Sequence, residues 1–370
     1  MIYILTHPFT SNYGGGLQAY ALQQVVTKIG YDVSIIEHIP SFAKREYFSE
    51  GKRIKWQHFK ELIKLIKGTL SYTPTFLRYR IAKQFKKNHM SFTPLEVANQ
   101  NAGYIVGSDQ VWRLKYTRTF GNPAKFFLDF ATEEQRNKSI CYAASFGTDE
   151  WEGSANETAT YRELLKDFRA VSVREASGIT LCRDKFGAHA VQMPDPTILL
   201  KAEVYNAVIK RAYTWRPPKR YMAAYMLDST EETQRLIQKT AQMLGLYLQP
   251  LLPNARAKKI RNRFPMSVPQ WLRSIRDCEY LVTDSFHGCV FSIIFNKPFV
   301  CLGNATRGSS RFDTLMGTFG LQDRLLTNAD PQAIEQLMAC PIDWTIVNAK
   351  MAEERKRGLL FLQQHLPQMR

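Results

Sequence analysis

Short apolar runs alternate with helical patterns along most of the chain. Residues 2–5 predict a strand, residues 17–30 carry apolar side chains at helical spacing, and residues 32–36 predict the next strand. The same rhythm resumes at residues 104–107 and continues to a strand at residues 299–302. Strands that alternate with helices are typical of a parallel sheet covered by helices, so the pattern predicts an α/β fold.

The length of the chain predicts more than one domain. It has 370 residues, and one domain accounts for about 150. Prolines at 194, 196, 217 and 218 interrupt the pattern near its middle. We therefore expect a Rossmann-like domain at residues 1–210 and a second at residues 211–345. A final helix at residues 346–370 should pack back toward the first domain. Residues 125–129 are also apolar enough to predict a strand of the first sheet.

Charge is unevenly distributed. The net charge is +17, and residues 41–90 hold thirteen Lys or Arg against three Glu. This stretch predicts a basic helical insertion at about residues 41–92. A basic surface attracts anionic lipid, nucleic acid or phosphorylated substrates. Apolar positions between 54 and 66 suit a helix on an anionic membrane, and they also suit an ordinary amphipathic helix packed on the domain.

The other compositional signals concern location and metal. The six cysteines form no C-x-x-C pair and lie in apolar stretches, as reduced buried cysteines do. The first residues lack the basic and apolar regions of a signal peptide, and the longest apolar run is too short to span a bilayer. We therefore expect a cytoplasmic protein, at most bound to the inner face of a membrane. No cluster of metal ligands stands out, and we expect no required cofactor.

A glycine-rich loop follows the first strand. Asn12 precedes Tyr13 and three glycines, among them Gly14 and Gly15, at the start of the predicted helix. Backbone N–H groups at a helix start favour an anion. The loop is neither the dinucleotide fingerprint nor a Walker loop, so it disfavours a dinucleotide or ATP site. Glycines in a tight turn without any ligand give the same pattern.

Polar residues also follow later strands. Asp109, Gln110 and Trp112 come directly after the strand at 104–107, where open α/β sheets bind ligands. Asp109 is a candidate general base, and a helix cap is the alternative interpretation. Arg174 follows the apolar residues 170–173 and suits a clamp on a carboxylate or phosphate, or else a pair with an adjacent acid.

The most specific element joins a strand to a helix in the second half. It places Ser285, His287 and Gly288 in one turn, and histidine is the side chain best suited to proton transfer near neutral pH. A structural histidine is the alternative. Further along, Arg311 lies in a turn rich in anion-binding groups, Arg307 to Asp313.

Taken in order, these segments resemble the polysaccharide pyruvyl transferase family. The resemblance covers about residues 1–325 and rests on NYGGGLQAYAL, GSDQVW, YAASFG, SVRE, DPTILL, TDSFHG with SIIFNKPFV, and SRFDTL. It implies two Rossmann-like domains in a GT-B-like arrangement with a cleft between them. It also implies phosphoenolpyruvate as the donor substrate, and a sugar acceptor that becomes a ketal and that is lipid-linked, nucleotide-linked or polymeric.

The resemblance and the local patterns together assign candidate roles. His287 and Asp109 are the catalytic candidates. The donor candidates are Arg174, Ser285, Gly288, Gly14, Gly15 and Arg311. The acceptor candidates are Asn12, Gln18, Gln110 and Trp112.

Two other classes of function compete. A GT-B glycosyltransferase or a nucleotide-sugar epimerase has the same architecture, and the five Lys or Arg between Arg256 and Arg263 would suit a diphosphate. A nucleic-acid-binding protein fits the net charge. It does not explain the polar clusters after the strands, and aromatic residues are not interleaved with the basic ones. We therefore expect no nucleic-acid partner.

Overall fold

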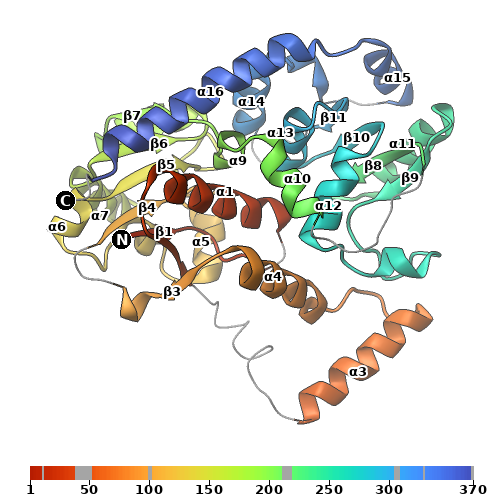
Figure 1. The fold of residues 1–370 in the computed structure, drawn as a ribbon, viewed down its shortest axis with the longest axis horizontal. Helices are drawn as coiled ribbons and strands as arrows, with labels where there is room; N and C mark the ends of the chain where they lie inside the picture. The colour runs from red at the N-terminus through yellow and green to blue at the C-terminus, as the bar shows by residue number, and fades with distance from the viewer. Residues whose placement is uncertain are drawn as a thin grey trace.

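The computed structural model describes residues 1–10, 12–37, 52–98, 102–210, 219–303, 309–327 and 330–367 (Figure 1). Within these ranges, two wholly parallel sheets carry helices between their strands. The predicted α/β architecture with two Rossmann-like sheets is therefore confirmed.

The first sheet contains the described strands that precede residue 193. Its spatial order is β3-β2-β1-β4-β5-β6-β7. The strands are β1 (Ile2–Leu5), β2 (Val33–Glu37), β3 (Phe92–Pro94), β4 (Gly103–Val106), β5 (Ile140–Ala144), β6 (Ala170–Val173) and β7 (Ala190–Gln192). The helices are α1 (Tyr13–Ile29), α3 (Lys52–Lys67), α4 (Thr75–His89), η1 (Leu95–Val97), α5 (Leu114–Phe120), η2 (Pro123–Phe127), α6 (Glu133–Asn137), α7 (Ala155–Lys166), α8 (Ala176–Phe186), α9 (Pro196–Leu199) and α10 (Ala202–Lys210).

The second sheet follows residue 220. Its spatial order is β12-β11-β10-β8-β9. The strands are β8 (Tyr221–Tyr225), β9 (Tyr247–Pro250), β10 (Tyr280–Thr283), β11 (Phe299–Leu302) and β12 (Leu325–Leu326). The helices are α11 (Glu231–Met243), η3 (Ile260–Arg263), α12 (Val268–Arg276), α13 (Phe286–Ile294), α14 (Ser310–Phe319), η5 (Gln322–Arg324), α15 (Pro331–Ala339) and α16 (Trp344–His365).

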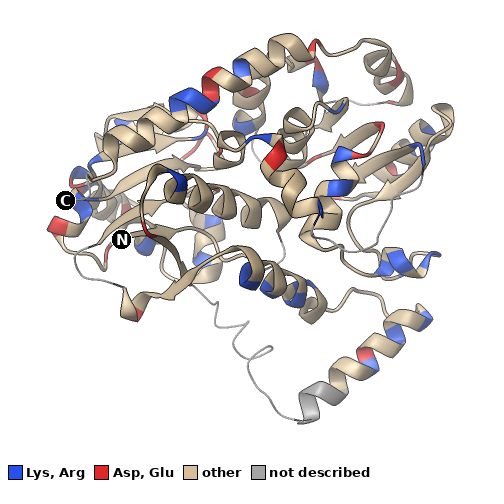
Figure 2. Ribbon diagram, in the orientation of Figure 1, with Lys and Arg blue, Asp and Glu red and all other residues tan. Residues whose placement is uncertain are grey.

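Two local expectations differ from the structure. The strand predicted at residues 125–129 is wrong, because residues 125–127 belong to the 3-10 helix η2 and residues 128–129 form the turn after it. Asn122 caps η2 by accepting a hydrogen bond from the backbone N–H of Ala124, and Pro123 starts the helix. The predicted basic insertion, in turn, does not extend to residue 92. Its described part forms α3 and α4, which are rich in Lys and Arg (Figure 2), and residues 92–94 form the edge strand β3. Residues 38–51 of the predicted insertion lie outside the described ranges.

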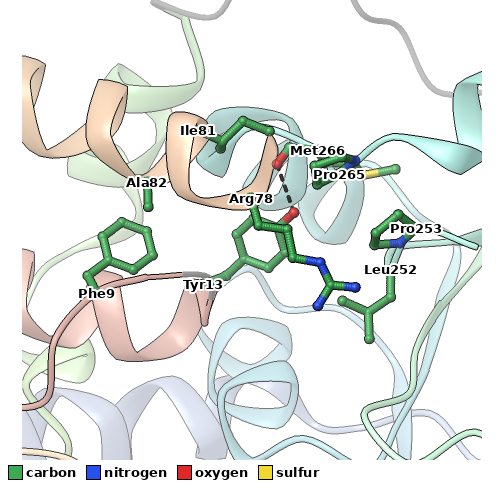
Figure 3. Close-up of a pocket in the computed structure, with 9 residues that line it drawn as sticks. All are labelled: Phe9, Tyr13, Arg78, Ile81, Ala82, Leu252, Pro253, Pro265 and Met266. Atoms are coloured by element: carbon green, nitrogen blue, oxygen red, sulfur yellow. Dashed lines mark hydrogen bonds between the residues drawn. The ribbon is translucent and has the colours of Figure 1, made fainter. Parts of the chain in front are cut away.

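An aromatic contact joins the two halves beside α1. The ring of Tyr13 stacks on Trp271 of α12 at 5.4 Å between centroids, and its hydroxyl donates a 2.7 Å hydrogen bond to the carbonyl oxygen of Met266. Figure 3 shows this bond, with Arg78 of α4 reaching past the ring toward Leu252. Burial raises the pKa of the Tyr13 phenol above its ordinary value, so the hydroxyl remains a donor.

The last helix, α16, returns from the second half to the first. It packs on α9 and α1, and the Arg355 guanidinium donates hydrogen bonds to the backbone carbonyls of Ile198 and Leu200. Gly358 lies at the closest approach. A Cβ atom there would lie 2.5 Å from both Leu199 Cδ2 and the Tyr142 hydroxyl. The absence of a side chain at Gly358 therefore sets how closely α16 can dock.

This contact predicts opposite effects for two helical glycines. Gly358→Ala should lower the free energy of unfolding by about 1–3 kcal/mol, because the added methyl group overpacks the interface. Gly317→Ala in α14 is the matched control. A Cβ there would meet nothing within 4 Å, so the better helix former should raise the free energy by about 0.5–1 kcal/mol. Urea unfolding of both variants checks the signs, and a stabilised Gly358→Ala would contradict this packing.

Candidate active site at the seam of the two sheets

Each sheet has a point where the order of its strands reverses. In the first sheet it lies between β1 and β4, and in the second between β8 and β10. Ligands of open α/β sheets bind at such points, beyond the carboxyl ends of the strands. Asp109 follows β4 and His287 follows β10, so both catalytic candidates come from switch points.

Arg174, Asp195 and His287 meet in a buried cluster. Arg174 Nη1 lies 2.9 Å from Asp195 Oδ2, and His287 Nε2 lies 3.5 Å from the same oxygen. Arg174 Nη2 lies 3.4 Å from Asp109 Oδ1, and the guanidinium stacks 4.4 Å from the centroid of the Phe286 ring. All five residues are at most 6% exposed. The first sheet supplies Arg174, Asp195 and Asp109 and the second supplies His287 and Phe286, so the cluster is a site shared by the two halves.

Asp109 is an ionised carboxylate in this environment. Its φ of 67° places it in the left-handed region. Burial opposes ionisation, but the charges of Arg174, His287, His7 and Arg311 outweigh it and hold the pKa of Asp109 below its ordinary value. A general base works best when its pKa is near the working pH. The structure therefore shows Asp109 as an anion beside Arg174, and its catalytic role remains a prediction.

The glycine loop at the start of α1 lies against both catalytic candidates. A Cβ at Gly14 would overlap the His287 imidazole, including Nδ1. A Cβ at Gly15 would lie 3.2 Å from Asp109 Oδ2 and 3.3 Å from Asn12 Nδ2. These glycines let the first turn of α1 approach the cluster closely. Donor binding by Gly14 and Gly15 remains a prediction.

Arg311 of α14 also lies beside the cluster. It is 6% exposed, and burial, followed by repulsion from Arg174, lowers its pKa to about 10. Attraction to Glu175 and Asp109 opposes this shift, while the charge of Arg113 adds to it. At neutral pH Arg311 is still a cation, and it lies close enough to Arg174 for the two to repel. Two neighbouring guanidinium groups are suited to bind a ligand with more than one negative charge.

Asp195 and Glu175 are site residues that the sequence analysis missed. Asp195 Oδ1 accepts hydrogen bonds from the backbone N–H and the hydroxyl of Thr197. Burial raises the pKa of Asp195, but His287 and Arg174 outweigh this effect and hold the pKa far below its ordinary value. Glu175 Oε1 accepts hydrogen bonds from Ser145 Oγ and from the backbone N–H groups of Phe146 and Gly147. The sequence does contain a signal for each residue, because Asp195 precedes a proline in DPTILL and Glu175 follows the arginine in SVRE. An acid in either position is also common at an ordinary helix start, so neither signal is specific.

Ser285 and Gly288 serve the start of α13. Ser285 Oγ accepts a 3.4 Å hydrogen bond from the Gly288 backbone N–H, which caps the helix. A Cβ at Gly288 would overlap Thr283 Oγ1. The structure thus gives both residues a local role at the start of the helix that carries His287, and donor binding by them remains a prediction. Arg307, the other cation noted near Arg311, lies outside the described residues.

The acceptor candidates divide into two pairs. Gln18 and Trp112 are 0% and 1% exposed, and their polar groups are used inside the domain. No surface of either remains for an acceptor, which corrects their predicted role. Asn12 is exposed and caps α1 at Gly15, and Gln110 is half-buried and accepts a bond from Arg113 Nη1. Only this second pair stays within reach of a bound molecule.

Two cavities lie near these residues. One, of about 20 Å³, is bordered by Arg174, Asp195, Phe286 and Arg311, and it has room for about one water molecule. The other, of about 320 Å³, lies beyond the carboxyl ends of β1, β2 and β3. It is lined by Leu5, Ile36, Glu37, Pro94, Leu95, Glu96, Thr117, Phe120, Gly121, Asn122, Lys125 and Phe126. Its aromatic residues pack on the His7 ring, whose centroid is 5.1 Å from that of Phe120 and 5.4 Å from that of Phe126.

Across the described ranges, no group of three or more His, Cys, Asp and Glu is arranged to hold a metal ion. Nor does any helix in them have the length and apolar character needed to cross a membrane. Five of the cysteines are buried and Cys340 is exposed, all of them as free thiols.

Comparison with solved structures finds remote likenesses over nearly the whole chain. A kitacinnamycin glycotransferase shares 14% identity, with a TM-score of 0.49 and 99% of each chain covered. The MnaA–UDP co-structure from S. aureus shares 12% identity at a TM-score of 0.48, covering 99% of this chain and 98% of that one. MurG of Acinetobacter baumannii shares 9% identity at a TM-score of 0.40, covering 100% and 99%. The family assignment does not depend on these likenesses.

Among curated proteins, none matches this sequence. The sequence model of the polysaccharide pyruvyl transferase family matches residues 12–306. This span begins at the cap of α1 and includes Asp109, Arg174, Asp195 and His287. The chain therefore belongs to the polysaccharide pyruvyl transferase family.

Proposed function

We propose that this enzyme transfers a pyruvyl group from phosphoenolpyruvate to two hydroxyls of a sugar, forming a ketal in the synthesis of a cell-surface glycan. Family membership supports the general role. The donor and the ketal are our inference from the buried cluster and its chemistry.

The observation that carries the proposal is a pair of buried nitrogens. Arg174 Nε and His287 Nε2 make no hydrogen bond among the described residues, although both residues are at most 5% exposed. Buried polar atoms are nearly always hydrogen-bonded, so two such atoms in one cluster support a place for a ligand. The two come from different sheets and share Asp195 as a neighbour.

The Arg174 guanidinium has one edge suited to a carboxylate. Nη1 is held by Asp195 at 2.9 Å, whereas Nη2 has only the longer 3.4 Å contact with Asp109. Nε and Nη2 form one edge of the planar group, and that edge can bind a carboxylate with two parallel hydrogen bonds. A donor carboxylate that displaces Asp109 would therefore leave the Asp195 contact intact. Arg311 would then face the phosphate.

His287 can carry the proton transfers of the reaction. In its protonated form it would give a proton to the methylene carbon of phosphoenolpyruvate while a first sugar hydroxyl adds to C2. The neutral imidazole would then accept the proton of that hydroxyl. The second hydroxyl would add to C2 as the C2–O bond to phosphate breaks, and its proton would leave with the phosphate. The products are the ketal and inorganic phosphate, and no redox change occurs.

The acceptor would lie in the 320 Å³ cavity of the first sheet. The cavity combines aromatic rings, Phe120 and Phe126, with polar side chains such as Glu96 and Lys125, which is the usual mixture for a sugar. His7 links it to the cluster, because its ring packs on the cavity wall and its charge acts on Asp109.

Donor entry requires the two halves to separate. The cavity beside Arg174 has room for only about one water molecule, so the described arrangement is closed. Opening would part His287 from Asp195 while the Arg174–Asp195 contact within the first half is kept. The donor would then help to close the seam around itself.

The direct test is phosphate release from phosphoenolpyruvate. We expect release that depends on a sugar acceptor, measured with a panel of UDP-linked and lipid-linked sugars, and a product heavier than the acceptor by one pyruvyl ketal. Hydrolysis or epimerisation of a UDP-sugar with no reaction of phosphoenolpyruvate would instead identify the glycosyltransferase or epimerase alternative.

His287 variants test the proton transfer. His287→Gln keeps a hydrogen-bond donor but cannot titrate, so turnover should fall by about 10²–10⁴-fold with little change in donor affinity. Gly14→Ala should also lower turnover, because its methyl group would displace the imidazole. Gly317→Ala, with open space at its Cβ, is the control. Normal turnover of His287→Gln would leave the histidine only a structural role.

Arg174 variants test the donor clamp. Arg174→Lys keeps the charge but loses the planar edge, so phosphoenolpyruvate should bind about 10–100-fold more weakly, the equivalent of one charged hydrogen bond. Arg235→Lys, on the exposed surface of α11, should change nothing. Isothermal titration with phosphoenolpyruvate measures the affinity. Equal affinity of Arg174→Lys and the unmodified enzyme would show that the guanidinium does not hold the donor.

A further inference from the structure

Helix α3 lies at the edge of the molecule (Figure 1). Phe59, Ile63 and Ile66 recur at the spacing of one helix face and are 52%, 36% and 46% exposed. Apolar side chains on a helix that packs on its own domain would be covered. The face of α3 that is covered is a different one, which contains the fully buried Leu65.

A basic row runs beside the exposed apolar row. Lys60, Lys64 and Lys67 each follow one of its members by one residue, which places them about 100° further round the helix. All three are exposed, and Lys64 and Lys67 make no ion pair within the described part of the chain. The helix therefore presents an apolar stripe with cations along one side.

The second half of the protein holds α3 in place. Arg263 of η3 donates from Nη1 to the carbonyl oxygens of Leu65 and Ile66, at 3.3 and 2.7 Å, and its own carbonyl accepts from Thr73 Oγ1 at 3.2 Å. His58 of α3 stacks on Phe76 of α4 at 4.1 Å between ring centroids. The helix is therefore joined to both halves, and η3 is its neighbour in the second half.

That neighbour repeats the character of α3. The segment from 256 to 263 contains five Lys or Arg and no acid. Within it Ile260 is 53% exposed, between the exposed Lys259 and Arg261. Figure 2 shows cations on α3 and on this neighbouring segment. Two segments about two hundred residues apart in sequence thus bring exposed isoleucines and cations to one region of the molecule.

We propose that α3 and η3 form a docking surface for an anionic lipid bilayer. The cations would lie at the headgroup level, and Ile63, Ile66 and Ile260 would enter the interface. A soluble polyanion would engage only the cations and leave the isoleucines in water. A second copy of the same surface would bring cations against cations. The bilayer is the partner that uses both features.

The test is co-sedimentation of the full-length protein with lipid vesicles. We expect binding to phosphatidylcholine vesicles that contain about a third phosphatidylglycerol, and almost none to phosphatidylcholine alone. Raising the salt concentration should weaken binding, because exposed charges are screened over about 10 Å at 0.1 M.

Two pairs of substitutions separate the cations from the apolar stripe. Lys64→Gln with Lys67→Gln should weaken binding by about 25-fold, since each lysine near an anionic surface contributes about fivefold. Ile63→Ser with Ile66→Ser should weaken it by about tenfold or more while the charge is unchanged. The matched controls are Lys239→Gln on α11 and Ile346→Ser on α16, an isoleucine that is 54% exposed. The controls should bind as the unmodified protein does.

The outcomes decide between partners. Loss of vesicle binding in both pairs, with unchanged thermal unfolding, supports a bilayer. Binding that falls only in the lysine pair, and that a soluble polyanion such as heparin abolishes equally in all variants, overturns the proposal in favour of an acidic polymer. Equal binding to neutral and anionic vesicles, or no binding, also overturns it. None of these readouts depends on enzymatic activity.

Discussion

The Asp195 carboxylate is the interaction on which the site depends. It is 1% exposed, and a buried carboxylate without partners would be strongly destabilising. Its two oxygens have different partners, because Oδ1 accepts hydrogen bonds from Thr197 and Oδ2 lies beside Arg174 and His287. The Arg174 contact is internal to the first half, whereas the His287 contact crosses the seam. Asp195 therefore stabilises the first half internally and also connects it to the second half.

Close packing imposes a second constraint at the same seam. The switch points of the two sheets must approach each other for Asp109 and His287 to share a ligand, and the first turn of α1 lies between them. Gly14 provides the clearance for the imidazole, and Gly15 the clearance for the carboxylate. The glycine loop thus has a packing function in the described state. Its backbone N–H groups can bind an anion only if the seam opens enough to admit one.

The sequence predicts the architecture well and the site only in part. Strand and helix periodicity predicted the central strands of both sheets, because buried parallel strands are nearly continuous apolar runs, but it missed the short edge strands β3 and β12. It failed at residues 125–129. Phe126 and Phe127 are apolar and buried there as strand residues would be, but they belong to a 3-10 helix that begins at Asn122 and Pro123. The apolar content of a segment predicts that it is buried but not whether it is a strand or a helix. Here the cap at Asn122 favoured a helix.

The site residues show the same division. Arg174 and His287 could be predicted because each follows a strand at its carboxyl end, where sheet topology places ligands. Asp195 could not be predicted, since an acid before a proline is an ordinary helix cap. Its contacts with Arg174 and His287 form only when segments distant in sequence meet. Gln18 was misassigned for a related reason. It lies on α1 within the glycine motif, but its amide is fully used in joining Thr6, Gly15 and Ser108. Long-range hydrogen bonding of this kind has no signature in local spacing.

The distribution of charge follows from these constraints. Within the cluster, Arg174 and Arg311 face Asp109, Asp195 and Glu175, so the buried site is close to electrically balanced before any donor is bound. A donor with several negative charges would bind there by replacing an acid at a cation, and the 3.4 Å contact of Arg174 with Asp109 is easier to replace than its 2.9 Å contact with Asp195. The excess of +17 therefore has to lie on the surface, and much of it lies on α3, α4 and η3. The buried acids and cations of the cluster and the surface cations of α3, α4 and η3 therefore lie in different parts of the molecule.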